Sequence, residues 1–261
     1  MKENIIDLKK IILKTVHSKK EGHIPSAFSI LDIMFALYDR VLRIDPKNPN
    51  APDRDRFILS KGHASIGLFA ILANAGFFPF SEFENFAAYD SKLGGHPDCN
   101  KVPGVEASTG SLGHGMPIAV GVALGEKIKK SDVKVYTIIG DGESNEGTIW
   151  EAALLAGHHK LDNLTCIVDY NHSTDPAIKV HDFTEKFKAF GWESFEADGH
   201  DQEALYQAFM KDPGGRPKAI IANTVKGRGI KKIESDMLAW HHKMPNDEEL
   251  DEFLGELNNR G

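Results

Sequence analysis

The sequence has little of several features that would point to a class of protein at once. Its 261 residues hold only two cysteines, Cys99 and Cys166, which form neither a zinc-binding spacing nor a disulfide framework and so suit a reducing compartment. No apolar run approaches the length of a membrane span, and the amino terminus lacks the apolar core of a secretory signal. The formal net charge of -7 argues against a broad basic surface for nucleic acid. We therefore expect a cytoplasmic protein with no membrane or nucleic-acid partner.

What the chain does contain is an alternation of strand-like and helix-like segments. Short apolar runs rich in β-branched residues predict buried parallel strands over residues 133–140, 164–170 and 218–225. Apolar residues at helical spacing predict helices over residues 5–20, 27–42, 148–159, 201–212 and 246–261. This alternation indicates one α/β domain over 1–261 with a doubly wound, mainly parallel sheet flanked by helices. Ligands of such sheets bind at the carboxyl ends of the strands.

The tripeptide Gly140-Asp141-Gly142 lies where the first of these strands ends. Glycines let the main chain bring its N–H groups close to an anion, but the carboxylate of Asp141 would repel a phosphate. A divalent cation between the two removes the conflict, because Mg²⁺ takes oxygen ligands and is commonly shared between protein oxygens and a phosphate. Asn171, at the carboxyl end of the next strand, would supply a second oxygen. Neither a G-x-G-x-x-G nor a Walker phosphate loop is present as an alternative.

The interval from Gly142 to Asn171 contains 28 residues and resembles the thiamine-diphosphate signature, a GDG followed by Asn after a helix and a strand. Further motifs resemble, in the same order, those of the amino-terminal half of transketolase. They are "EGHIPSAFSILDIM", "DRDRFILSKGHAS", "GGHPD", "STGSLGHGMPIAVGVALGEK", "ADGHD", "KGRGI" and "AWHHKMP". The resemblance covers nearly the whole chain and implies the diphosphate-binding module of thiamine-dependent enzymes.

The resemblance also implies a set of cofactor and metal contacts. Asp141 and Asn171 are similar to the side-chain ligands of Mg²⁺, or of another divalent cation such as Ca²⁺ or Mn²⁺, with the carbonyl of Ser173 as a third ligand. The residues that would contact thiamine diphosphate come from loops and strand ends. They are Ser26, Lys61, His63, Gly110, Leu112, Gly113, Gly140, Asp141, Gly142, Glu143, Asn171, Lys226 and His241.

Four histidines resemble the catalytic histidines of the family: His23, His63, His96 and His241. Histidine suits this role because it donates or accepts a proton near neutral pH, and these four would hydrogen-bond sugar hydroxyls and the developing oxyanion. His242 remains an alternative to His241, which is favoured only by its place after Trp240. We interpret the remaining histidines singled out, His17, His158, His159 and His181, as helix or surface residues.

Three further positions are open to two interpretations. Glu146 and Glu151 resemble the acids that link two cofactors across a transketolase dimer interface, but they also fit a solvated first helical turn, where acids favour the helix dipole. His114 stands where the family usually has glutamine, which changes the expected contacts around the cofactor ring and the donor substrate.

The implied activity is that of a transketolase, which transfers a two-carbon ketol unit from a ketose or ketose phosphate to an aldehyde or aldose. The sequence contains no counterpart of the pyrimidine-binding and carboxy-terminal domains, the first of which supplies an activating glutamate. We therefore expect these domains on a separate subunit, in an α₂β₂ heterotetramer. Three alternatives remain: the α subunit of a 2-oxoacid dehydrogenase, a fragment similar to 1-deoxyxylulose-5-phosphate synthase, and a non-catalytic regulatory subunit that binds thiamine diphosphate.

Overall fold

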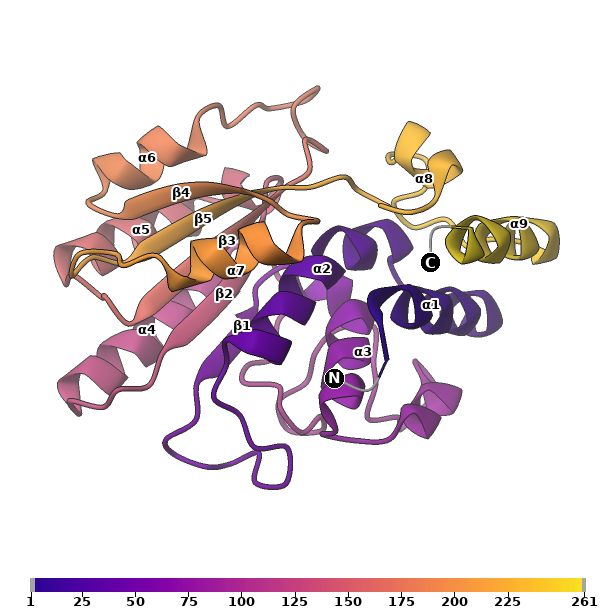
Figure 1. Ribbon diagram of the computed structural model, residues 1–261, viewed down its shortest axis with the longest axis horizontal. Coiled ribbons are helices and arrows are strands. Elements are labelled where there is room, and N and C mark those ends of the chain that lie inside the picture. Colours follow the sequence, from indigo (N-terminus) through magenta and orange to yellow (C-terminus); the bar gives the residue numbers. More distant parts are fainter. Residues whose placement is uncertain (1–2, 260–261) are drawn as a thin grey trace.

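A five-stranded parallel sheet forms the centre of the computed structural model, which describes residues 3–259 (Figure 1). The strands lie in the order β1-β2-β3-β5-β4, and each neighbouring pair is parallel. Their bounds are β1 Arg56–Leu59, β2 Val135–Gly140, β3 Leu164–Tyr170, β4 Glu193–Asp198 and β5 Lys218–Asn223. The three predicted strands are confirmed as β2, β3 and β5, and so is the predicted fold class.

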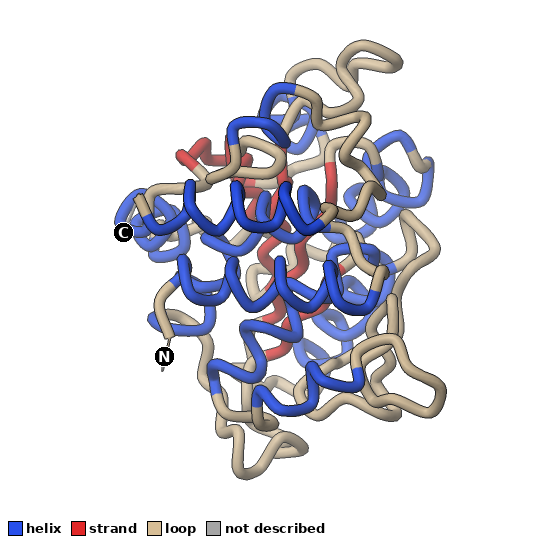
Figure 2. Tube along the Cα trace, turned by 90° about the vertical axis from the view of Figure 1, so that its right-hand side faces the viewer, coloured by secondary structure: helices blue, strands red, loops and turns tan. Residues whose placement is uncertain are grey.

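Helices cover both faces of the sheet, as Figure 2 shows from the side. Helices α4, α5 and α6 pack on one face, where they share a core with Val135 and Ile139 of β2. Helices α2 and α7 pack on the other face with Tyr136 and Ile138, and α1 and α3 lie against α2. The bounds are α1 Ile5–Lys19, α2 Ile24–Arg40, α3 Ser65–Ala75, α4 Gly115–Ile128, α5 Gly147–His158, α6 Phe183–Ala189, α7 Gln202–Met210, α8 Lys231–Ser235 and α9 Asp247–Asn258.

The helix ends follow local chemistry. Helix α2 begins at Ile24, three residues before the predicted helix over 27–42, because Pro25 is well suited to a first helical turn, where no N–H is needed. Helix α9 begins with a capping box between Asn246 and Glu249. Its apolar face packs against α1, which confirms the predicted amphipathic helix over 246–261, although residues 260 and 261 lie outside the described part of the chain.

Neither β1 nor β4 is among the predicted strands, and β4 departs most from the expected pattern. Its residues, "ESFEAD", alternate between polar and apolar and lack the continuous apolar run of the inner strands. The structure explains this pattern, because β4 pairs only with β5 and lies at the edge of the sheet. An edge strand keeps one side open to solvent and needs fewer apolar residues.

The carboxyl ends of four strands lead into segments that carry predicted site residues. Strand β1 leads to residues 60–63, β2 to Asp141, β3 to Asn171 and β5 to residues 224–226. Since the strands are parallel and adjacent, these segments meet at one edge of the sheet, as expected for a doubly wound fold. Within residues 3–259, no helix has the length and apolar character needed to cross a membrane.

Candidate active site

The three predicted metal ligands are neighbours at this edge. The Ser173 hydroxyl donates to Asp141 Oδ1 over 3.1 Å, and the Ser173 amide donates to Asn171 Oδ1 over 3.2 Å. The amide of Gly142, which we predict to contact a diphosphate, donates to Asp141 Oδ1 over 2.7 Å. Asp141 Oδ2 is buried and has no hydrogen-bond partner. One carboxylate oxygen is therefore fixed by the protein, and the other is available to a ligand.

The electrostatic setting of Asp141 fits a cation. Burial raises the pKa of its carboxyl, and the negative charge of Asp169 raises it further. A buried carboxylate with no cation in direct contact is costly, and a bound metal ion would reduce that cost. Among residues 3–259, no three His, Cys, Asp or Glu side chains gather closely enough to hold a metal. A metal at Asp141 would therefore depend on amide and carbonyl oxygens, which Mg²⁺ accepts.

A second buried carboxylate, Asp169 of β3, was not predicted. Its Oδ2 accepts from the ammonium of Lys61 over 2.5 Å and from Asn171 Nδ2 over 2.9 Å. Its Oδ1 accepts from the hydroxyls of Ser29, over 2.6 Å, and Thr224, over 2.5 Å. Burial alone would raise the pKa of Asp169, but Lys61 and the hydroxyl donors hold it below its usual value. Asp169 thus joins segments that follow three strands and positions both Lys61 and Asn171.

Glu143, predicted to contact the cofactor, has a different set of neighbours. Its Oε1 accepts from the Ser60 hydroxyl over 2.5 Å and from the Gly113 amide over 2.9 Å. Its Oε2 accepts from the Gly140 amide over 3.1 Å. Burial raises the pKa of Glu143, and these three donors oppose the rise. The side chain therefore holds together the loops after β1 and β2 and the loop of residues 110–114 before α4, called the glycine loop below. All three border the site.

Replacing Glu143 with Ala is expected to reduce the free energy of unfolding by about 3 kcal/mol, since it leaves buried donors at three loops without an acceptor. Urea denaturation at pH 7 measures this loss. The matched control is Glu84→Ala, because Glu84 is exposed in the 3₁₀ helix Phe80–Asn85. The control should change stability by less than about 0.5 kcal/mol. Equal stabilities for the two variants would contradict the role assigned to Glu143.

Three of the predicted histidines come together. The ring centroid of His23 lies 5.3 Å from that of His63 and 5.5 Å from that of His241, and those of His63 and His241 are 5.9 Å apart. His242 belongs to the same group, with its ring 4.6 Å from that of His23. Both His241 and His242 therefore have their rings beside that of His23.

His96 also borders this group. A Cβ atom on Gly110 would lie 2.8 Å from Cδ2 of His96, so the glycine allows the imidazole to approach the backbone. The positive φ of Gly110, 155°, is likewise easiest for glycine. His96 contributes to the lowered pKa of His23, which places it in the same electrostatic environment.

The imidazoles of His23, His63 and His241 are neutral near pH 7. Burial is the main cause: it lowers the pKa of His63 to about 2 and that of His23 to about 4, and nearby lysine and histidine side chains add to both effects. Burial and the neighbouring Lys226 also lower the pKa of His241. Neutral imidazoles can each donate one hydrogen bond and accept another, which suits them to hydroxyl groups.

Lys226 and Ser26 complete this part of the site. The Lys226 ammonium lies 3.3 Å from His241 Nδ1, and burial lowers the pKa of Lys226 to about 8. Ser26 lies in the first turn of α2 and is fully buried. Some buried side-chain atoms of residues 3–259 have no hydrogen-bond partner, and those at predicted site residues are His23 Nδ1, Ser26 Oγ and Asp141 Oδ2. Unpaired buried polar atoms in one region are the donors and acceptors that a polar ligand would use.

The glycine loop packs directly on the segment after β1. A Cβ on Gly62 would lie only 2.7 Å from the backbone N of Gly110, so the two main chains touch at this point. Leu112, predicted to contact the cofactor, lies half-buried in this loop. His114 is exposed, and its Nδ1 lies 3.0 Å from the Leu112 carbonyl oxygen.

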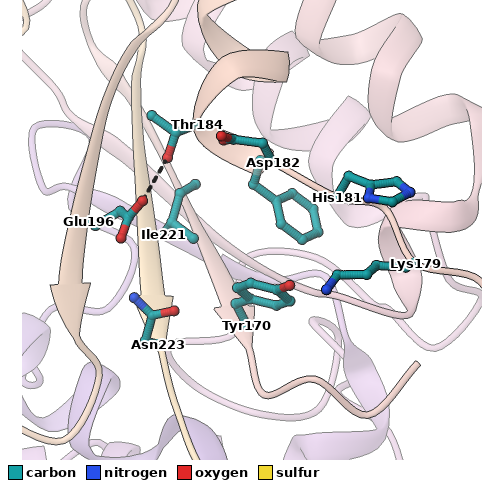
Figure 3. Close-up of a pocket in the computed structure, with 9 residues that line it drawn as sticks. Tyr170, Lys179, His181, Asp182, Thr184, Glu196, Ile221 and Asn223 are labelled. Atoms are coloured by element: carbon teal, nitrogen blue, oxygen red, sulfur yellow. Dashed lines mark hydrogen bonds between the residues drawn. The ribbon is translucent and has the colours of Figure 1, made fainter. Parts of the chain in front are cut away.

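The predicted interface acids lie outside the group of histidines. Glu146 follows the 3₁₀ turn after Asp141, Glu151 lies in α5, and both are exposed. A separate pocket of about 410 Å³ lies between α6 and the ends of β3, β4 and β5, where Tyr170, Glu196 and Asn223 line it (Figure 3). It contains none of the predicted site residues.

A family model, several relatives and solved structures that match this chain all belong to one family. Residues 1–252 match the thiamine diphosphate binding domain of transketolase. One of the subunits of the apulose-4-phosphate transketolase of Actinobacillus succinogenes is 42% identical, and the match covers 95% of this chain and 92% of that protein. The 6-deoxy-6-sulfo-D-fructose transketolase subunit SqwG of a Clostridium species is 37% identical, with both chains covered completely.

Longer transketolases match over part of their length. The mouse transketolase is 43% identical over a stretch that covers 85% of this chain but 36% of the mouse protein. The crystal structure of the transketolase from Campylobacter jejuni superposes with a TM-score of 0.89 at 31% identity, covering 99% of this chain and 43% of that one. The resemblance inferred from the motifs is confirmed: the chain belongs to the transketolase family, as a subunit of the kind that carries the thiamine-diphosphate-binding domain of this enzyme class.

Proposed function

We propose that this chain is the cofactor-holding subunit of a two-chain transketolase in the cytoplasm. In this proposal residues 1–261 form a single diphosphate-binding domain, and a separate chain provides the pyrimidine-binding and carboxy-terminal domains. The proposal rests on how much of each relative's length this chain matches. The chain matches relatives named as subunits over 92% and 100% of their length, but it matches the mouse transketolase over only 36%.

The metal and the diphosphate would be held at the edge of the sheet. Asp141, Asn171 and the Ser173 carbonyl would bind Mg²⁺, or Ca²⁺ or Mn²⁺ in its place, and the unpaired Oδ2 of Asp141 supports this assignment. Lys226, whose ammonium is buried and has a lowered pKa, would contact the cofactor. When bound, thiamine diphosphate supplies the electron sink that breaking and forming a carbon–carbon bond needs.

The chain's own contribution to transfer would be orientation and hydrogen bonding. His23, His63 and His241 form a compact group of neutral imidazoles, and His96 lies at its border. Such a group can bind the hydroxyls of a sugar and stabilise negative charge on a carbonyl oxygen. The unpaired Nδ1 of His23 supports a direct contact with a ligand.

We propose that the assembly contains two copies of this chain and two of its partner. The support comes from the outer surface of α4 and α5, where Ile118, Leu154 and Leu155 are exposed beside an apolar groove of about 290 Å³. Glu151 lines the same groove. A second copy packed here would bury the apolar side chains and bring Glu146 and Glu151 to the interface, as the resemblance implies.

The substrates would be small sugars or sugar phosphates. Two relatives are named for apulose 4-phosphate and for 6-deoxy-6-sulfo-D-fructose, so these compounds are the first donors or acceptors to test beside common pentose phosphates. A partner gene is expected next to the gene for this chain.

The test is reconstitution from separately purified chains. This chain alone is expected to show no ketol transfer, and an equimolar mixture with the partner chain, thiamine diphosphate and Mg²⁺ is expected to convert a ketose and an aldose into new sugars. Full activity of this chain alone would exclude the two-chain site. Decarboxylation of 2-oxoacids without ketol transfer would favour the dehydrogenase alternative, and inactivity of the mixture would favour a regulatory role for this chain.

A further inference from the structure

The turn Asp198–Asp201, which joins β4 to α7, has no role in the site described so far. The Gly199 amide donates to the Asn223 carbonyl over 2.8 Å. A Cβ on Gly199 would collide with the methyl group of Thr224 and would lie 3.0 Å from the same carbonyl oxygen. Glycine is therefore required at this position, and the turn packs tightly on the segment that follows β5.

His200 makes two specific hydrogen bonds from this turn. Its Nε2 lies 2.8 Å from the backbone N of Val225 and must accept the amide proton. Its Nδ1 therefore carries the proton of the neutral ring and donates to Asp32 Oδ2 over 3.0 Å. The side chains of His200 and Asp32 are each 10% exposed. Asp32 in turn belongs to α2, the helix that His23 precedes.

The segment fixed by His200 contains residues that belong to the active site. Thr224 donates to Asp169, and Lys226 lies against His241. Further along, the Gly227 amide donates to the Pro25 carbonyl over 3.1 Å. The bond to His200 lies between these anchors and holds the backbone directly before Lys226.

We propose that His200 is a positioning residue of the cofactor site: through the Val225 amide it fixes the buried ammonium of Lys226, and Asp32 fixes the orientation of its ring. The proposal rests on the proposed function in that Lys226 is assigned there to the cofactor. It gives a role to the "ADGHD" motif, whose histidine lies outside the group of histidines at the site.

Two substitutions separate the two hydrogen bonds. His200→Asn keeps an amide donor near the position of Nδ1, and so can still bond to Asp32, but it has no acceptor that reaches Val225. His200→Gln places an amide oxygen near the position of Nε2 and can still accept from Val225. If the bond to Val225 carries the effect, the Asn variant should be impaired and the Gln variant should recover.

The first measurement is the rate of reductive methylation of Lys226 in the full chain without cofactor, located by peptide mass spectrometry. His200→Asn is expected to increase this rate about threefold to tenfold, the effect of losing one hydrogen bond of ordinary strength, and His200→Gln is expected to restore the slow rate. Lys218 is the matched control, because it is equally buried in β5 and donates to the Phe209 carbonyl. An unchanged rate at Lys226, or an equal increase at Lys218, would overturn the proposal.

The second measurement is calorimetric affinity for thiamine diphosphate with Mg²⁺, using this chain together with its partner. His200→Asn is expected to weaken binding about threefold to tenfold, and His200→Gln should bind like the wild type. Faster methylation of Lys226 with unchanged affinity would overturn the positioning role. A wild-type complex that bound no thiamine diphosphate would contradict the proposed function, whereas the methylation rates would still report whether His200 fixes Lys226.

Discussion

Replacing Asp141 with Asn is expected to abolish Mg²⁺-dependent binding of thiamine diphosphate without weakening the fold. The carboxylate is the only charged group among the three proposed ligands, and its Oδ2 has no partner in the protein. Loss of a residue that merely supports a metal ligand commonly reduces affinity about 10- to 100-fold, so loss of a charged ligand should reduce it by at least about 100-fold. Isothermal calorimetry with and without Mg²⁺ measures the change.

The thermal stability of the metal-free chain provides the control for this variant. Burial and Asp169 raise the pKa of Asp141, so the ionised carboxylate destabilises the folded chain at any pH above that raised value. Asp141→Asn removes the charge and should melt at the same or a higher temperature than the wild type at pH 7. The difference should vanish at acid pH, where Asp141 is protonated. Unchanged affinity, or a large loss of stability at pH 7, would contradict the assignment of Asp141 to a metal.

Unlike Asp141→Asn, the substitution Lys61→Met is expected to destabilise the metal-free chain. The expected loss is about 3–5 kcal/mol in the free energy of unfolding at pH 7. Lys61 and Asp169 form a buried ion pair whose side chains are 2% and 0% exposed. Removal of the ammonium leaves the carboxylate of Asp169 with hydroxyl and amide donors but with no cation in direct contact. Urea denaturation of the metal-free chain measures the loss.

The double variant Lys61→Met/Asp169→Asn is the control for the ion pair. It removes both charges, so it should recover part of the stability lost in the single variant. The pKa of Asp169 is held below its usual value, so the stability that its ionised form contributes is present above the unfolded pKa and is lost as the pH falls through the lowered value. A Lys61→Met variant within about 1 kcal/mol of the wild type would contradict a structural role for the pair.

Much of the fold followed from the sequence because the inner strands are apolar on both faces. Strands β2, β3 and β5 each lie between two other strands, and each contains a short run of buried apolar residues. Strand β4 has only one neighbouring strand and tolerates polar residues, so no such run marked it.

The proposed metal ligands and the group of histidines could be inferred only through motif spacing and resemblance. The sequence gives less indication of the residues that position these side chains. Asp169 lies inside the apolar strand "LTCIVDY" and was not predicted, although a carboxylate in such a strand indicates a buried partner. Glu143 and His200 lie within recognised motifs, but only the hydrogen bonds of the folded chain show what they hold.

The packing of α9 on α1 has a consequence for the order in which the site forms during synthesis (Figure 1). The proposed Mg²⁺ ligands and the sheet around them lie within residues 56–223, so a nascent chain can form that part early. His23 lies directly after α1, whereas His241 lies shortly before α9. The group of histidines is therefore completed only when the first and last helices meet, and a partly synthesised chain would have the proposed metal ligands in place before this group is complete.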